Sequence, residues 1–148
     1  MRVLLDTNVV ISGLLTRGGH PSRIVDLWVE GRFTAVVCPA ILEEYLTVLL
    51  RPRFRVIGST EKRFALIHNL IGLHNTVLIH PDPSLHVDTV KNHRADNRFL
   101  ECALAAEAQF LVSGDRDLPA LNDFESVTIC SPADFLKALP DNPPPQGP

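Results

Sequence analysis

The chain has 148 residues, of which 45% are hydrophobic and 21% are charged, and its formal net charge is −3. A chain of this length and composition forms about one globular domain and needs neither a metal nor a disulfide framework to fold. The negative charge argues against a protein that coats nucleic acid, and no apolar run approaches the length of a membrane span. Because Asp6 interrupts any signal-peptide core, we expect a cytoplasmic protein that does not contact a membrane.

Short apolar runs alternate with segments of helical spacing along the chain. In chain order, we expect a strand over residues 2–5, helices over 9–15 and 21–30, a strand over 33–38, helices over 40–50 and 60–73, a strand over 77–79, a helix over 96–107, strands over 110–112 and 127–130, and a helix over 132–139. Thr60 and Ser131 are the expected caps of the helices that follow them.

Strands that alternate with helices predict a parallel sheet with right-handed crossovers. We therefore expect an α/β fold, a three-layer α/β/α sandwich with a central parallel sheet of about four or five strands. This domain is expected to cover residues 1–139. Residues 140–148 are rich in proline and almost free of apolar side chains, which predicts a disordered tail.

The three cysteines, Cys38, Cys102 and Cys130, are far apart in the sequence and odd in number. They match neither a disulfide framework nor a metal motif, and no neighbouring residues support a catalytic thiol. We expect small buried apolar residues in a reducing compartment.

Two acidic residues follow predicted strands directly. Asp6 ends the run Val3–Leu5, and Asp115 follows the strand over 110–112. Ligands of open parallel sheets bind at the carboxyl ends of the strands, so these two acids are candidates for one shared site. Each has an ordinary alternative: Asp6 would serve as a helix cap, and Asp115 would serve in a turn.

Two more acids lie on predicted helices. Asp96 opens a helix whose inward face carries Phe99 and Leu100, so it lies on the side that faces the sheet, although an N-cap role explains it equally well. Glu43 and Glu44 both lie at the edges of an apolar helix face, and periodicity does not choose between them.

Carboxylates that share a small site repel one another, and a divalent cation removes that cost. Mg²⁺ and Mn²⁺ prefer oxygen ligands and need only one or two carboxylates beside water and substrate phosphate. Such a site suits hydrolysis of a phosphodiester. A glycosidase pair is less suitable, because aromatic residues make up only 6% of the chain.

The neighbours of these acids resemble the motifs of the PIN-domain family. The sequence Leu5-Asp6-Thr7-Asn8 resembles the family's opening motif, and Val112-Ser113-Gly114-Asp115-Arg116-Asp117-Leu118 resembles its later Thr/Ser-x-Asp-x-Asp-Leu motif. The segments 96–103 and 41–52 resemble two intervening helices, and in the second helix the glutamate before tyrosine is the site residue. The resemblance therefore selects Glu44, and it extends to about Leu139.

The resemblance implies a metal-dependent endoribonuclease similar to VapC toxins of toxin–antitoxin modules. It implies Mg²⁺ or Mn²⁺ as cofactor, an RNA substrate, a cognate antitoxin protein and a homodimer. The implied catalytic residues are Asp6, Glu44, Asp96 and Asp115; Asp6, Asp96 and Asp115 hold metal, and Asn8, Ser113 and Asp117 position the carboxylates, the water or the substrate.

The sequence departs from the family pattern in two places. Residues 93–95 read His-Arg-Ala where related sequences often carry another acid, which puts a second metal in doubt. Ser113 replaces the commoner threonine but keeps the hydroxyl group.

Two alternative functions remain open. The first is a PIN-like module that binds RNA or protein with weak or no catalysis, against which the presence of all four acids argues. The second is a phosphatase of the haloacid-dehalogenase kind, which would carry a second aspartate at position 8, where this chain has Asn8.

Basic residues cluster at Arg51, Arg53 and Arg55, at Lys62 and Arg63, and later at Lys91, Arg94 and Arg98. Such a cluster is either a solvated face or a set of phosphate contacts. The sequence does not decide between these two.

Overall fold

The computed structural model describes residues 1–82, 94–114 and 123–140, with the backbone alone at residues 94–96 and 123–124. The elements are β1 (Arg2–Leu5), α1 (Thr7–Leu15), α2 (His20–Val29), β2 (Thr34–Val37), α3 (Pro39–Leu49), the 3-10 helix η1 (Pro52–Ile57), α4 (Thr60–Ile71), β3 (Thr76–Leu78), α5 (Arg94–Ala105), β4 (Phe110–Val112), β5 (Asp123–Phe124), β6 (Val127–Cys130) and α6 (Pro132–Ala138). Every expected strand and helix is present within one or two residues of its predicted bounds. The sequence pattern did not predict η1 or β5.

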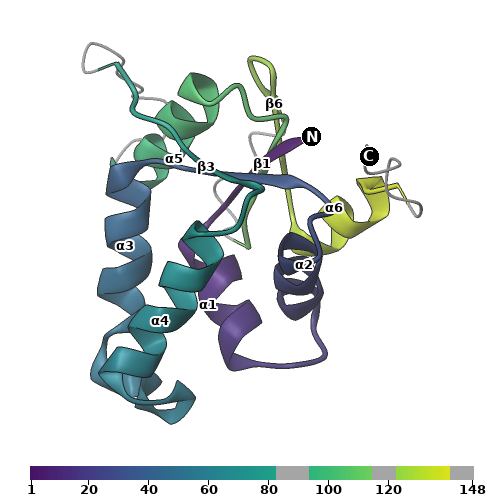
Figure 1. The fold of residues 1–148 in the computed structure, drawn as a ribbon. Coiled ribbons are helices and arrows are strands. Elements are labelled where there is room, and N and C mark those ends of the chain that lie inside the picture. Colours follow the sequence, from purple (N-terminus) through teal and green to yellow (C-terminus); the bar gives the residue numbers. More distant parts are fainter. Residues whose placement is uncertain (83–93, 115–122, 141–148) are drawn as a thin grey trace.

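The strands form a single sheet in the order β3-β2-β1-β4-β6-β5. Neighbouring strands from β3 to β6 pair in parallel, and among the described strands only the two-residue β5 is antiparallel to its neighbour. The helix α5 lies on one side of the sheet, and α1 to α4 lie on the other (Figure 1). The expected α/β/α sandwich with a parallel sheet is therefore confirmed.

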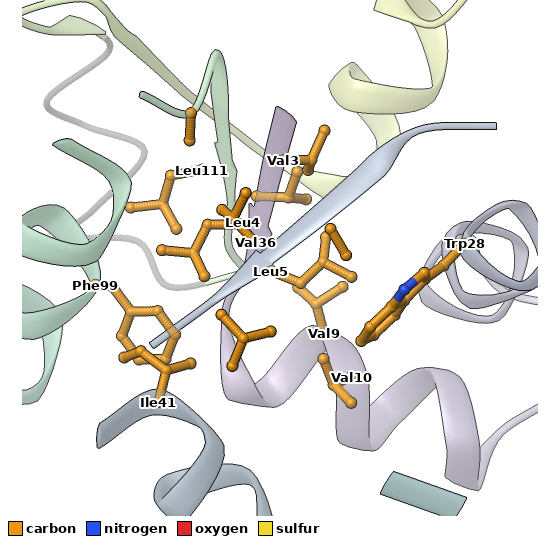
Figure 2. Packing of buried hydrophobic residues seen from close by; sticks show 14 of the residues in the cluster. Val3, Leu4, Leu5, Val9, Val10, Trp28, Val36, Ile41, Phe99 and Leu111 are labelled. Carbon is orange, nitrogen blue, oxygen red and sulfur yellow. The ribbon is translucent and has the colours of Figure 1, made fainter. Parts of the chain in front are cut away.

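The core forms where side chains from both helical layers meet the sheet. Val3, Leu4 and Leu5 of β1 are at most 2% exposed, because β1 lies in the middle of the sheet and has helices on both faces. Figure 2 shows these residues within one cluster with Ile41 of α3 and Phe99 of α5. Such burial contributes about 1.5–3 kcal/mol for each large apolar side chain and fixes β1, whose carboxyl end begins the site described below.

The helix ends follow local capping rules. The side chain of Ser131 accepts a hydrogen bond from the backbone N–H of Asp134 at 3.1 Å, which confirms the predicted cap of α6. At α4 the prediction was wrong by one residue, because Ser59 and not Thr60 accepts the bond from the N–H of Lys62 at 3.1 Å. Serine and threonine are both good caps, and the local sequence could not separate them.

The prediction that all three cysteines are unpaired was wrong. Cys38, which directly follows β2, forms a disulfide with Cys102 of α5, while Cys130 is free. Both bonded residues are buried, as expected. The two cysteines are 64 residues apart in the sequence, and they meet because α5 packs next to the carboxyl end of β2 in the folded chain.

Among the helices of the described ranges, none has the length and apolar character needed to cross a bilayer. The last described element is α6, which ends at Ala138. The tail after residue 140 lies outside the described residues, so its predicted disorder and the predicted domain boundary stay predictions.

Candidate active site

Asp6 lies at the point where the order of strands reverses. From β1 the chain proceeds to β2 on one side, and from β3 it crosses to β4 on the other side of β1. Open α/β sheets bind ligands outside the carboxyl ends of the strands at such a point. Asp6 follows the last residue of β1, and its backbone N–H donates to the carbonyl of Val112, the last residue of β4, at 2.9 Å.

The carboxylate of Asp6 does not serve as the cap of α1. Asp6 occupies the N-cap position with an extended backbone, yet its side chain makes no capping hydrogen bond. Instead, its Oδ2 accepts a hydrogen bond from the hydroxyl of Ser113 at 2.7 Å, and both residues are buried. A buried carboxylate is costly to maintain, so the ordinary explanation of Asp6 as a cap does not account for its position.

Ser113 is fixed by the same edge of the sheet. It follows β4, and its backbone N–H donates to the carbonyl of Cys130 at the end of β6 at 2.9 Å. Its side chain has no exposed surface. The ends of β1, β4 and β6 therefore together set the orientation of the Asp6 carboxylate.

Glu44 on α3 adjoins Asp6 through Thr7. The hydroxyl of Thr7 donates a hydrogen bond to Glu44 Oε2. Glu43, its neighbour in sequence, is exposed, whereas Glu44 is partly buried. The structure thus brings Glu44 and not Glu43 towards Asp6, a choice that periodicity alone did not make.

Tyr45 ties α3 to β1 beside these acids. Its buried hydroxyl donates to the carbonyl of Leu5, and burial raises its pKa well above the usual value, with further increases from the negative charges of Asp6 and Glu44. The phenol therefore stays protonated and keeps its donor role. Sequence reasoning assigned no role to Thr7 or Tyr45, although both belong to the segments that resemble family motifs.

The other predicted site residues are placed less completely. Asn8 is exposed and its side chain makes no hydrogen bond to any residue within the described ranges, so its positioning role stays a prediction. Asp96 lies in the first turn of α5, where only its backbone is described. Asp115 and Asp117 lie outside the described residues.

The helix α5 that carries Asp96 is anchored to the same region. It packs against α3, β1 and β4, and the disulfide joins it to the residue before α3. The beginning of α5 and the carboxyl ends of β1 and β4 therefore belong to neighbouring parts of the fold, a requirement for Asp96 to act together with Asp6.

The donor set is one of oxygen atoms. Carboxylates and hydroxyls suit Mg²⁺ or Mn²⁺ better than softer metals, and Asp6 with Glu44 supplies two carboxylates. Within residues whose side chains are described, no group of three or more His, Cys, Asp or Glu forms a candidate metal site. The described residues therefore fit a cation that takes one or two protein carboxylates and completes its shell with water and substrate.

Two solved structures share the fold. One is VapBC2 from Rickettsia felis bound to a DNA fragment from their promoter, with a TM-score of 0.59, 12% identity, and coverage of 88% of this chain and 98% of that one. The other is a domain of a functionally unknown protein from Methanocaldococcus jannaschii, with a TM-score of 0.53, 16% identity, and coverage of 86% and 88%. At these identities the likeness shows the fold alone.

The sequence comparisons show the family. The chain is similar to the uncharacterized protein MJ1680 of Methanocaldococcus jannaschii, with 32% identity over 123 residues that make up 83% of this chain and 76% of that protein. Residues 2–117, which include Asp6, Glu44, Asp96 and Asp115, match the PIN domain. The chain therefore belongs to the PIN-domain family.

Proposed function

We propose that this PIN-domain protein is an endoribonuclease that depends on Mg²⁺ or Mn²⁺ and hydrolyses RNA phosphodiester bonds. The observation that carries the proposal is the buried carboxylate of Asp6 at the strand-order reversal, which Ser113 orients and which does not cap a helix. A buried charge in this position costs stability, and a role in chemistry explains why it is there.

Each described residue has a distinct task in this proposal. Ser113 holds the Asp6 carboxylate in one orientation, and Thr7 does the same for Glu44. Tyr45 holds α3 against β1, so that the two carboxylates keep their separation. Preorganised groups of this kind need little rearrangement during the reaction.

The remaining acids complete the proposed site. Asp6, Asp96 and Asp115 would hold the cation, Glu44 would complete the acidic site, and Asn8 and Asp117 would position water or substrate. A bound divalent cation supplies charge to stabilise the phosphodiester in its transition state and lowers the pKa of a coordinated water.

The partners belong to the same proposal. VapBC2 of Rickettsia felis shares the fold, which supports a toxin that pairs with a cognate antitoxin protein. We propose in addition a homodimer, as the family resemblance implies, and a cytoplasmic location, where cellular RNA is found.

The test is cleavage of a structured RNA by the purified chain with Mg²⁺ or Mn²⁺ and with EDTA. We expect metal-dependent cleavage that Asp6→Asn abolishes, because asparagine still accepts the bond from Ser113 but lacks the charge. Asp26→Asn is the matched control, because the Asp26 side chain is about half exposed and its one described ion pair is with Arg17 at 3.4 Å.

A second pair of variants exploits neighbouring glutamates on one helix. Glu44→Gln should lose activity, while Glu43→Gln, one residue away and exposed, should retain it. Equal activity in the two variants would remove Glu44 from the site.

Thermal unfolding gives a readout that does not depend on turnover. Mn²⁺ should raise the melting temperature of the native chain and not that of Asp6→Asn, because a ligand of the folded state stabilises it by mass action. Metal binding without cleavage of any RNA would favour the binding-module alternative. The absence of both metal binding and RNA cleavage would refute the proposed site.

A further inference from the structure

The segment over residues 51–63 has an unusual balance of charge. It contains the basic residues Arg51, Arg53, Arg55, Lys62 and Arg63 and only one acidic residue, Glu61, in a chain whose net charge is negative. The structure divides this set: Arg63 is 4% exposed, whereas the other four basic residues are exposed.

Arg63 is a structural residue that fixes the backbone of this segment. Its guanidinium donates to the carbonyl of Leu49 at 2.9 Å, to that of Arg51 at 3.1 Å and to that of Gly58 at 3.0 Å. These acceptors lie at the end of α3 and on both sides of η1. The buried guanidinium therefore supplies hydrogen bonds to a backbone carbonyl at the end of α3 and to carbonyls on both sides of η1, and so holds η1 in place.

The exposed arginines stand on this fixed segment, and none has a carboxylate partner among the side chains that the structure describes. Arg51, Arg53 and Arg55 form no ion pair with any residue in the described ranges. Phe54 between them is buried and anchors the turn, with the Arg53 guanidinium 4.6 Å from its ring centroid. Three unpaired guanidinium groups in five residues repel one another, and an anion relieves that repulsion.

This basic segment begins directly after α3, the helix that carries Glu44 of the proposed site. Glu44 lies five residues before Leu49, the last residue of α3, which is a rise of about 7.5 Å along the helix, and Arg51 lies outside the helix as the extended residue before η1. The η1 segment also packs against α1, which begins at Thr7 of the site. Figure 1 shows α3 running from the sheet to the far end of the molecule, where the chain turns into α4.

We propose that Arg51, Arg53, Arg55 and Lys62, here named the η1 basic surface, bind the phosphates of single-stranded RNA a few nucleotides from the bond that is cleaved. The inference deepens the proposed function and depends on it for the identity of the substrate. Arginine binds phosphate oxygens through paired N–H groups, and the burial of Phe54 leaves no aromatic face within η1 for base stacking. Because contacts to phosphate carry no sequence information, binding at this surface is independent of base sequence.

The test measures RNA binding in EDTA, so that no cleavage intervenes. The probe is an unstructured fluorescent RNA, and its affinity is measured by anisotropy over a range of salt concentrations. Each phosphate contact to single-stranded RNA contributes about 0.7 to the slope of log K against log salt, so replacing Arg51, Arg53 and Arg55 with glutamine should lower the slope by about 2. The affinity at low salt should fall roughly a hundredfold, and the melting temperature should not change.

Two control variants make the result specific. Replacing Arg17, Arg23 and Arg32 with glutamine removes the same charge from the chain, but Arg17 and Arg23 already pair with carboxylates at 3.4 and 3.6 Å, and the slope should not change. Replacing the three η1 arginines with lysine keeps the charge and should keep most of the slope.

The outcomes separate this inference from the proposed function. In cleavage assays the glutamine variant should show a raised KM with unchanged kcat. Three results would overturn the inference: an unchanged salt slope in the glutamine variant, an equal fall of the salt slope in the control variant, or no RNA binding by the native chain. The last result is the one expected if the surface binds an acidic protein instead. Binding through the η1 basic surface without cleavage in any metal would preserve the inference and refute the nuclease.

Discussion

The disulfide between Cys38 and Cys102 joins two elements that carry proposed catalytic residues. Cys38 directly precedes α3, which bears Glu44, and Cys102 lies on α5, which bears Asp96. Reducing the bond tests the cross-link alone, because it removes no side chain and both sulfur atoms can stay buried. We predict that reduction strongly lowers the free energy of unfolding and loosens the contact between α3 and α5.

The magnitude follows from the length of chain that the bond closes. The separation of 64 residues gives a loop-closure entropy that corresponds to about 4 kcal/mol at 25 °C in the chain-entropy account of disulfides. For a chain of this size, that change lowers the melting temperature by roughly 10 °C. Disulfides are uncommon in reducing compartments, so for a protein expected in the cytoplasm the reduced state is relevant as well.

The assay is equilibrium unfolding in guanidinium chloride, with and without reductant. The native chain should lose about 4 kcal/mol in reductant. A variant with alanine at positions 38 and 102 should show no effect of reductant, whereas Cys130→Ala should show the full effect because Cys130 is free. Alkylation of the unreduced, unfolded chain should modify one cysteine.

Two results would refute this reasoning. Modification of all three cysteines without reductant would show that the bond does not form. The second result is a fall in the free energy of unfolding of less than about 1 kcal/mol on reduction, in a chain that is shown to contain the bond. It would mean that the disulfide does not restrict the unfolded chain as the entropy account requires.

Three further predictions concern single residues. Ser113→Ala removes the hydrogen bond to the buried carboxylate of Asp6 and should lower the free energy of unfolding by about 2 kcal/mol, with Ser113→Thr as the control that keeps the hydroxyl. Arg63→Met leaves several backbone carbonyls without a donor, and denaturant unfolding should show a loss of about 3 kcal/mol. Burial, followed by the negative charge of Asp134, raises the pKa of Cys130 from 9.0 to about 11. The thiol of the folded chain should therefore resist alkylation at pH 9 and react as the pH approaches 11. Its contribution to stability should decline over the same interval, because the thiol ionises at a lower pH in the unfolded chain than in the folded chain. Rapid alkylation of the folded chain at pH 9 would contradict this assignment.

The sequence alone determined most of the architecture. Alternation of short apolar runs with amphipathic segments predicted each of the strands of the parallel sheet and the helices between them. Two short elements escaped this reading: η1 carries one buried apolar residue, Phe54, and β5 spans two residues, so neither produces a periodic signal.

The sequence also drew attention to Asp6, because an acid that ends an apolar run is visible without a structure. The family resemblance implied that Ser113 positions a carboxylate or water, but the sequence did not show that its partner is Asp6 or that Thr7 bonds to Glu44. Resemblance to a family selected Glu44 over Glu43, and the tertiary structure supplies a physical reason for that choice.

Only the tertiary structure decided which distant residues meet. A periodic pattern shows which residues share a face only within one or two helical turns. The crossovers of a parallel sheet bring together residues from remote segments, such as Cys38 and Cys102, or Asp6 and Ser113. The same limit applies to Arg63, which reads as one more charge in a basic cluster until its buried hydrogen bonds are known. Local composition determined the elements of this protein, and the packing of those elements determined its site.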